Sequence, residues 1–255
     1  MYTIYVGSLF DVAHITYMII SLAVTAILLI LAKRHLKASL HKDFFLKFFA
    51  LATFLLHVSI MWVDFFKNGS ANAPTSVLFP IYFCNMSMYM LMLVAFWGDK
   101  KSKTFQSLAI LTAYGGFFGA MISLFYPEYY LGASSMFEWG VLKSMISHST
   151  MLVGAIWLLI GNYFPIRITN TIVYAVGLLF YGLVGIIVNQ TFLYFGHGNP
   201  NAMYLDHAPL SDVPFLNAYT ISLLMLLFII IFALFYEIIY VKKNERSFQQ
   251  FVFFK

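Results

Sequence analysis

NTIVYAVGLLFYGLVGIIVNQTFLY, residues 170–194, contains no Lys, Arg, Asp or Glu. A helix needs about 20 mostly apolar residues to cross the hydrocarbon core of a bilayer, so this stretch is long enough for one crossing. The whole chain has 255 residues, of which 62% are hydrophobic and only 10% charged. About a quarter of the residues in a soluble domain are charged, so this composition is typical of an integral membrane protein.

Similar apolar runs lie on both sides of this stretch, separated by polar or Pro/Gly breaks. They predict an all-α fold, a bundle of seven transmembrane helices. The expected helices span residues 12–32, 44–65, 77–97, 104–126, 141–162, 170–194 and 215–241. Little chain remains outside them, so residues 1–255 are expected to form a single transmembrane domain. The first residues lack the features of a cleaved signal peptide, and the first helix is expected to be retained.

The distribution of Lys and Arg between the loops predicts orientation, because short cytoplasmic loops keep positive charge. Twelve of these residues fall on one side: Lys33, Arg34, Lys37, Lys42, Lys100, Lys101, Lys103, Arg167, Lys242, Lys243, Arg246 and Lys255. The other side holds only Lys67, while Lys47 and Lys143 lie near helix ends. We therefore expect a multi-pass plasma-membrane protein with a cytoplasmic C-terminus and an N-terminus outside. The basic residues form no continuous face, so no nucleic-acid partner is expected.

Polar side chains inside the predicted helices mark candidate functional positions, because such groups are costly at membrane depth. In the predicted topology they gather in the outer half of the bundle: His14, His57, Asp64, Cys84, Asn85, Ser147, His148, Ser149, Asn189 and Gln190. At a rise of about 1.5 Å per residue, Cys84 and His148 each lie roughly 10 to 12 Å below the outer ends of their helices. A polar pocket that opens outward is the simplest arrangement.

Cys84 follows Pro80 closely, and proline is tolerated in the first turn of a helix. A thiol near a helix N-terminus is favoured as thiolate, the form that attacks esters, and a nearby His148 could accept its proton. In the alternative interpretation Cys84 is a small apolar packing group and Asn189 joins helices. A single cysteine without paired Cys/His spacing indicates no structural zinc site, and no metal or cofactor is expected.

Five segments resemble the YwaF family of bacterial integral membrane proteins, which is related to the transmembrane protein 164 lipid acyltransferase family. These are SLFDVAHITYM (8–18), FPIYFCNMSMYM (79–90), LFYPE (124–128), KSMISHSTML (143–152) and IVNQTFLYF (187–195). The resemblance implies a cysteine–histidine acyltransferase of lipids, with Cys84 and His148 at the matching positions. The family pattern often has a histidine two residues before the cysteine, where this chain has Tyr82.

The leading hypothesis is a membrane-embedded enzyme in which Cys84 takes an acyl chain from a membrane phospholipid as a thioester. His148 would act as base and acid, and the acyl chain would pass to a lipid or amine. His57 or Asn189 would polarise the carbonyl or orient His148, and the other supporting residues would be His14, Asp64 and Asn85.

Two alternatives stay open. The same pocket suits a non-enzymatic small-molecule binder or a transport-related protein, although no internal repeat is evident. A haem or metal protein using His14, His57 and His148 is the other alternative, which an optical spectrum or a metal analysis would test. A retinal protein is disfavoured, because the last predicted helix contains no lysine.

Overall fold

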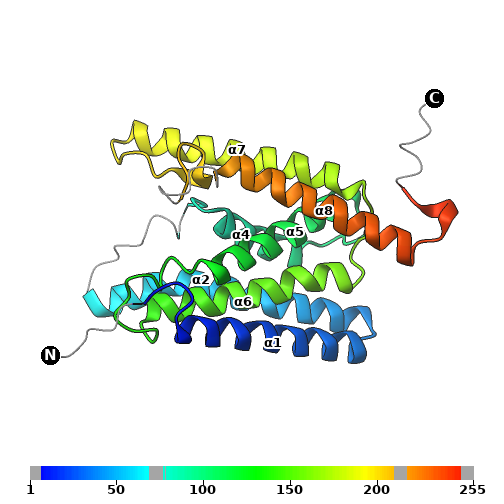
Figure 1. Ribbon diagram of the computed structural model, residues 1–255, viewed down its shortest axis with the longest axis horizontal. Coiled ribbons are helices and arrows are strands. Elements are labelled where there is room, and N and C mark those ends of the chain that lie inside the picture. The colour runs from blue at the N-terminus through cyan, green and yellow to red at the C-terminus, as the bar shows by residue number, and fades with distance from the viewer. Residues whose placement is uncertain (1–6, 69–76, 78, 210–216, 248–255) are drawn as a thin grey trace.

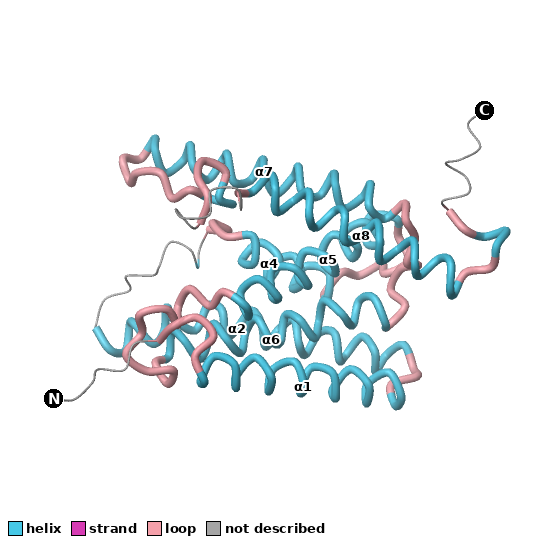
Figure 2. Tube along the Cα trace, viewed as in Figure 1, coloured by secondary structure: helices cyan, strands magenta, loops and turns pink. Residues whose placement is uncertain are grey.

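The computed structural model describes residues 7–68, 77, 79–209 and 217–247, apart from the side chains of Asp64, Lys67 and Asn68. The described residues form seven α-helices and two short 3-10 helices, without a strand (Figures 1 and 2). The α-helices are α1 (Val12–His35), α2 (Ser39–Asn68), α4 (Phe83–Ala95), α5 (Lys103–Phe125), α6 (Trp139–Ile160), α7 (Asn170–Tyr194) and α8 (Ala218–Tyr240). The 3-10 helices are η1 (Ala202–Tyr204) and η2 (Lys243–Glu245). The all-α prediction is confirmed.

Six of these helices are long and apolar enough to cross a membrane, namely α1, α2, α5, α6, α7 and α8. Three of them have an N-cap residue directly before the helix, whose side chain accepts a hydrogen bond from a backbone N–H of the first turn. These residues are Asp11 before α1, Ser102 before α5 and Asn217 before α8. The expected range 170–194 coincides with α7, while α2 begins at Ser39, five residues before the expected start.

The helix expected over residues 77–97 is shorter in the structure. α4 has 13 residues, about 20 Å at 1.5 Å per residue, against a hydrocarbon core of about 30 Å. Pro80 has no N–H and disfavours helical backbone at Phe79, so the apolar run before it does not continue into α4, which begins at Phe83. Cys84 is therefore the second residue of the helix. Residues 79–82 are irregular, and the Ile81 carbonyl accepts a hydrogen bond from the Met203 N–H.

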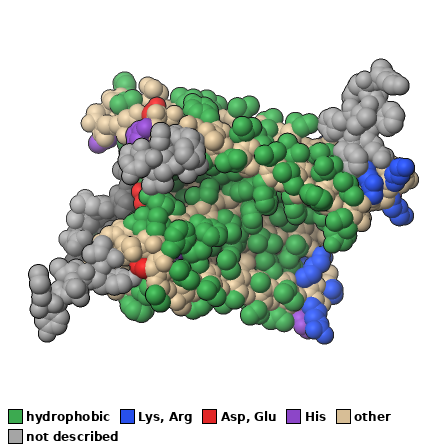
Figure 3. Space-filling model, viewed as in Figure 1, with side chains coloured by type: hydrophobic (Ala, Val, Ile, Leu, Met, Phe, Trp, Pro, Cys, Tyr) green, Lys and Arg blue, Asp and Glu red, His purple; other side chains and the backbone are tan. Residues whose placement is uncertain are grey.

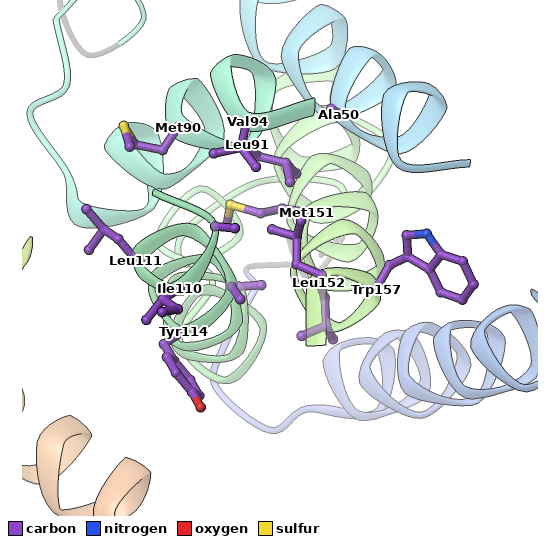
Figure 4. Close-up of a cluster of buried hydrophobic side chains, with 14 of the residues drawn as sticks. Ala50, Met90, Leu91, Val94, Ile110, Leu111, Tyr114, Met151, Leu152 and Trp157 are labelled. Carbon is purple, nitrogen blue, oxygen red and sulfur yellow. The ribbon is translucent and has the colours of Figure 1, made fainter. Parts of the chain in front are cut away.

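The helices are arranged around α4 and α5, with α1, α2 and α6 on one side and α7 and α8 on the other (Figure 1). The largest buried cluster fills the space where α2, α4, α5 and α6 meet (Figure 4). Small residues allow close contact there. A Cβ at Gly116 would lie 2.9 Å from the Cβ of Ala155, and a Cβ at Gly119 would lie 3.1 Å from the Cα of Cys84. Glycine at position 119 therefore lets α5 pack against the backbone at Cys84.

Lys and Arg gather at one end of the bundle, where α1 and α8 finish, as Figure 3 shows for the visible face. We call this the basic end. Lys33 at the end of α1 donates to the Ile160 carbonyl at the end of α6. Lys100 forms an ion pair of 2.7 Å with Asp43, which joins the α4–α5 link to the start of α2. The predicted clustering of the basic links at one end is therefore present in the bundle.

Candidate functional site

A cavity of about 710 Å³ lies between α2, α4, α5, α6, α7 and α8, and its thiol and imidazole residues come from the half of the bundle away from the basic end. Five of the candidate residues line it: His57, Cys84, Asn85, Ser147 and His148. They come from α2, the start of α4 and the first half of α6. Three neighbouring elements thus bring a thiol, two imidazoles and an amide to one space.

The Cys84 thiol lies at the N-terminal end of α4, where the backbone N–H groups of the first turn and the helix dipole favour negative charge. Its Sγ donates to Asn85 Oδ1 over 3.5 Å. The Ser123 hydroxyl and the backbone N–H groups of Cys84 and Asn85 also interact with the sulfur. These N–H groups and the hydroxyl are donors that suit a thiolate or an oxyanion formed next to it.

His148 is buried, and its hydrogen bonds define the tautomer. Its Nδ1 lies 2.6 Å from the backbone carbonyl of Ser144, one turn earlier in α6. A carbonyl only accepts hydrogen bonds, so Nδ1 carries the proton and a neutral ring has its lone pair on Nε2. Nε2 is buried and has no hydrogen-bond partner among the described residues. His148 therefore has a ring nitrogen that can accept a proton.

His57 is a second buried imidazole of the cavity wall. Its ring meets the ring of Tyr89 edge to face, with the centroids 5.8 Å apart. Its Nε2 also has no partner in the described part of the chain. A ring nitrogen in this position can hydrogen-bond a carbonyl or a hydroxyl that enters the cavity.

The remaining candidates lie elsewhere or are not described. His14 is buried outside the cavity lining: its Nδ1 accepts from the Phe10 N–H at 3.0 Å, and its Nε2 donates to the Leu124 carbonyl at 2.8 Å. Asn189 also lies outside the lining and holds the loop after α7, through the Ala202 N–H at 2.7 Å and Asp206 at 3.2 Å. The side chain of Asp64 lies outside the described residues.

The structure adds polar residues that the sequence patterns did not single out. Lys143 is buried in α6 and lines the cavity, with its Nζ 4.8 Å from the centre of the Tyr129 ring. The sequence contains one sign of this role, because Lys143 is a charged residue within a predicted transmembrane helix. Ser123 and Glu128 also line the cavity. Burial raises the pKa of the Glu128 carboxyl, which lies in the loop after α5.

The three histidines of the haem or metal alternative are not gathered, because His14 is bonded outside the cavity. Among the residues that the structure describes, no group of three or more His, Cys, Asp or Glu side chains is placed to hold a metal ion. The described lining offers a thiol, imidazoles, hydroxyls, an amide, a carboxyl and an amine.

Six long apolar helices indicate a multi-pass membrane protein. Residues 9–239 match the model of the TMEM164 family, and the chain belongs to this family. The match covers nearly the whole chain and confirms the relation to this family that the five sequence segments indicated. No curated protein and no solved structure matches the chain.

Proposed function

We propose that the protein is a lipid acyltransferase with Cys84 as nucleophile and His148 as general base and acid. The observation that carries the proposal is the unpartnered Nε2 of His148, buried in the same cavity as the Cys84 thiol at a helix N-terminus. A thiol in apolar surroundings needs a base to ionise, and neutral His148 supplies one. The YwaF-like segments around both residues add support.

In the first half of the reaction His148 Nε2 takes the thiol proton, and the sulfur attacks the carbonyl carbon of a phospholipid ester. The C–O bond breaks as the tetrahedral intermediate collapses, and His148 returns the proton to the departing lysophospholipid oxygen. Cys84 then carries the acyl chain as a thioester. In the second half a lipid hydroxyl or an amine gives its proton to His148 and attacks the thioester, which restores the thiol.

The oxyanion formed at each attack needs hydrogen-bond donors. The backbone N–H groups at the start of α4 and an Nε2–H of His57 are the donors that we assign to it. Asn189 has both amide atoms engaged with the loop at Ala202 and Asp206, so its assigned role is to hold this loop rather than to polarise the carbonyl.

The proposal includes the membrane topology. We infer seven crossings in the plasma membrane, with the basic end in the cytoplasm, the N-terminus outside and the short α4 completed by irregular chain before it. Non-helical backbone at membrane depth is tolerated where protein covers it, and the loop at Met203 bonds to Ile81 in this position. The thiol and imidazoles of the cavity then lie in the outer half, within reach of outer-leaflet phospholipid.

Thioester formation tests the enzymatic proposal directly. Purified protein is incubated with phospholipid, and intact-mass spectrometry or acyl-biotin exchange detects the acyl group in wild type, Cys84→Ser and His148→Ala. Wild type should carry a hydroxylamine-sensitive acyl group that is lost in Cys84→Ser and strongly reduced in His148→Ala. A matched control is Ser149→Ala, since Ser149 lies next to His148 but bonds Tyr17 and Ser21 outside the cavity. No thioester in wild type with donor lipid supplied would refute the proposal.

A non-enzymatic binder of small anions is the second candidate, and Lys143 favours it. A buried ammonium in the cavity wall is suited to a carboxylate or phosphate ligand. Ligand affinity in Cys84→Ala and thioester formation in wild type together distinguish the anion binder from the acyltransferase. A binder retains its ligand affinity in Cys84→Ala and forms no thioester in wild type, whereas the acyltransferase forms one.

A further inference from the structure

The cavity continues from its polar residues into an apolar groove between α7 and α8. This part of the lining includes Leu178, Leu179, Gly182, Leu183, Ile221 and Leu226. A second, wholly apolar depression of about 290 Å³ shares Ala175, Leu223 and Leu226 with the first. It extends along both helices to Thr171 on α7 and Ile230 on α8. We call the combined feature the α7–α8 groove.

The part of the α7–α8 groove around Gly182, which we call its upper part, lies at the level of the Cys84 thiol. The ring of Tyr181 meets the ring of Phe83 with the centroids 5.1 Å apart, and Phe83 is the residue before Cys84. Gly182, next to Tyr181, lines the cavity, and a Cβ built on it has no other atom within 4 Å. The groove therefore has open space beside α7 at the height of the proposed nucleophile.

The length of the groove fits one acyl chain. From Gly182 to Thr171 the helix rises about 16 Å, at 1.5 Å per residue. One leaflet of a bilayer contributes half of a hydrocarbon core of about 30 Å, so its chains are of similar length. The walls are almost entirely apolar, which suits a hydrocarbon chain and disfavours a polar ligand.

The edges of the groove face the membrane. Leu179 is 76% exposed and Leu223 is 66% exposed, and they lie on the two helices that bound the groove. In a bilayer these surfaces contact lipid, so a chain can enter sideways between α7 and α8 without leaving the hydrocarbon.

We infer that the α7–α8 groove binds the acyl chain that is transferred, with Gly182 leaving its upper part open and Ala175 lying where its two parts meet. This inference rests on the proposed acyl transfer. The ester carbonyl then lies near Cys84, and the methyl end of the chain points along α7 toward the basic end. Ala175 sets chain-length preference, because it borders both parts of the groove.

Three substitutions to Trp on one helix test this assignment. Gly182→Trp should abolish thioester formation with all long chains, because the indole fills the groove beside the thiol. Ala175→Trp should retain short chains and lose long ones, measured with phospholipid donors of graded chain length. Val176→Trp is the control, since Val176 is 62% exposed and lines neither part. An unchanged chain-length profile in Ala175→Trp, with a folded protein by thermal melting, would contradict the groove.

Chain binding can also be measured without catalysis. Cys84 is the only cysteine, so Cys84→Ser combined with Gly182→Cys places a single thiol in the groove. A dialkyl ether phospholipid, which has no ester to transfer, should slow maleimide labelling of this thiol several-fold in detergent. The control, Cys84→Ser with Val176→Cys, should label at an unchanged rate.

The two measurements separate the two proposals. If the ether lipid protects position 182 but wild type forms no thioester, the groove assignment is supported and the acyl-transfer proposal is refuted. The opposite result is a thioester in wild type, no protection at position 182 and no change of chain-length profile in Ala175→Trp. It would support acyl transfer and refute the groove assignment.

Discussion

At His148, the Ser144 carbonyl determines which ring nitrogen is available for catalysis. Because Nδ1 donates to this carbonyl over 2.6 Å, Nε2 is the only site that can take a proton from a thiol. The carbonyl belongs to the preceding turn of the same helix, so ordinary helix geometry fixes the tautomer. A base held in this way needs no carboxylate partner.

Cys84 and His148 should fail together if they act in one step. Cys84→Ala and His148→Ala should each abolish acyl transfer, and the double variant should be barely worse than either single one, because both remove the same step. The measurement is turnover with a fluorescent phospholipid. Cys84→Ala should also keep its melting temperature, since a small, mostly apolar side chain is replaced by another. Additive losses, or full activity without Cys84, would make the cysteine a packing residue.

His14 should matter for stability and not for chemistry. Its ring accepts a hydrogen bond from the Phe10 N–H just before α1, donates one to the Leu124 carbonyl at the end of α5, and is fully buried. His14→Ala leaves the buried Leu124 carbonyl without this donor and should lower the free energy of unfolding by about 1–3 kcal/mol. Denaturation in detergent measures the loss, and the thioester assay provides the control. A stable His14→Ala variant that forms no thioester would assign His14 to the reaction instead.

Glu128 should make stability depend on pH. Burial raises the pKa of its carboxyl above the ordinary value of 4.5, so the folded state prefers the neutral form. Stability is then highest below about pH 4.5 and falls as the pH rises through the raised pKa. Glu128→Gln should melt at a higher temperature than wild type at pH 7, and the difference should vanish in acid. Glu245→Gln, at an exposed carboxylate, is the control, and equal melting of Glu128→Gln and wild type at pH 7 would contradict the prediction.

Among the elements, the long helices could be predicted and the short one could not. Residues 170–194 coincide with α7 because an uninterrupted apolar run has one way to satisfy its backbone in a membrane. α4 differs because apolar residues on both sides of Pro80 extend the run beyond the segment that is helical. The same holds for the candidate site. Cys84 and His148 were expected at a similar depth, and both line one cavity. The hydrogen-bond partners of His14 and Asn189 come from other segments of the chain, which no local sequence pattern reveals.

The contact between α5 and α6 should not accept a larger side chain at its closest point. A Cβ at Gly116 would lie 2.9 Å from the Cβ of Ala155, so Gly116→Leu forces the helices apart. Overpacking of this kind costs about 1–3 kcal/mol, which thermal melting in detergent would detect. Gly182→Leu is the matched control on a transmembrane helix, because its Cβ meets open space. Equal melting temperatures for the two variants would show that α5 and α6 can separate without cost.

At the scale of the whole molecule, charge and polarity are separated along the bundle axis. The basic links lie at one end, and the thiol and imidazoles of the cavity lie in the other half. Two partly buried interactions stabilise the basic end: the ion pair of Lys100 with Asp43, and the hydrogen bond from the Ile168 N–H to the Glu237 carboxylate at 2.8 Å. The arrangement leaves the α7–α8 pair attached beside α5, where a groove between the two helices can open to lipid.

The crossing by α4 decides the topology, and the position of Lys101 tests it. If α4 and the irregular residues before it complete one crossing, Lys101 lies on the same side as the link after α1, in the cytoplasm. If they turn back, only six crossings remain and Lys101 lies on the opposite side. In the Cys84→Ser background, single cysteines at Lys37, Lys101, Asn201 and Lys243 should react with a membrane-impermeant maleimide in intact cells only at Asn201. Labelling of position 101 from outside would overturn the seven-crossing topology. The lysines of the α4–α5 link would then lie outside, on the opposite side of the membrane from the other basic links. Short cytoplasmic loops retain positive charge, so the seven-crossing topology predicts the reverse.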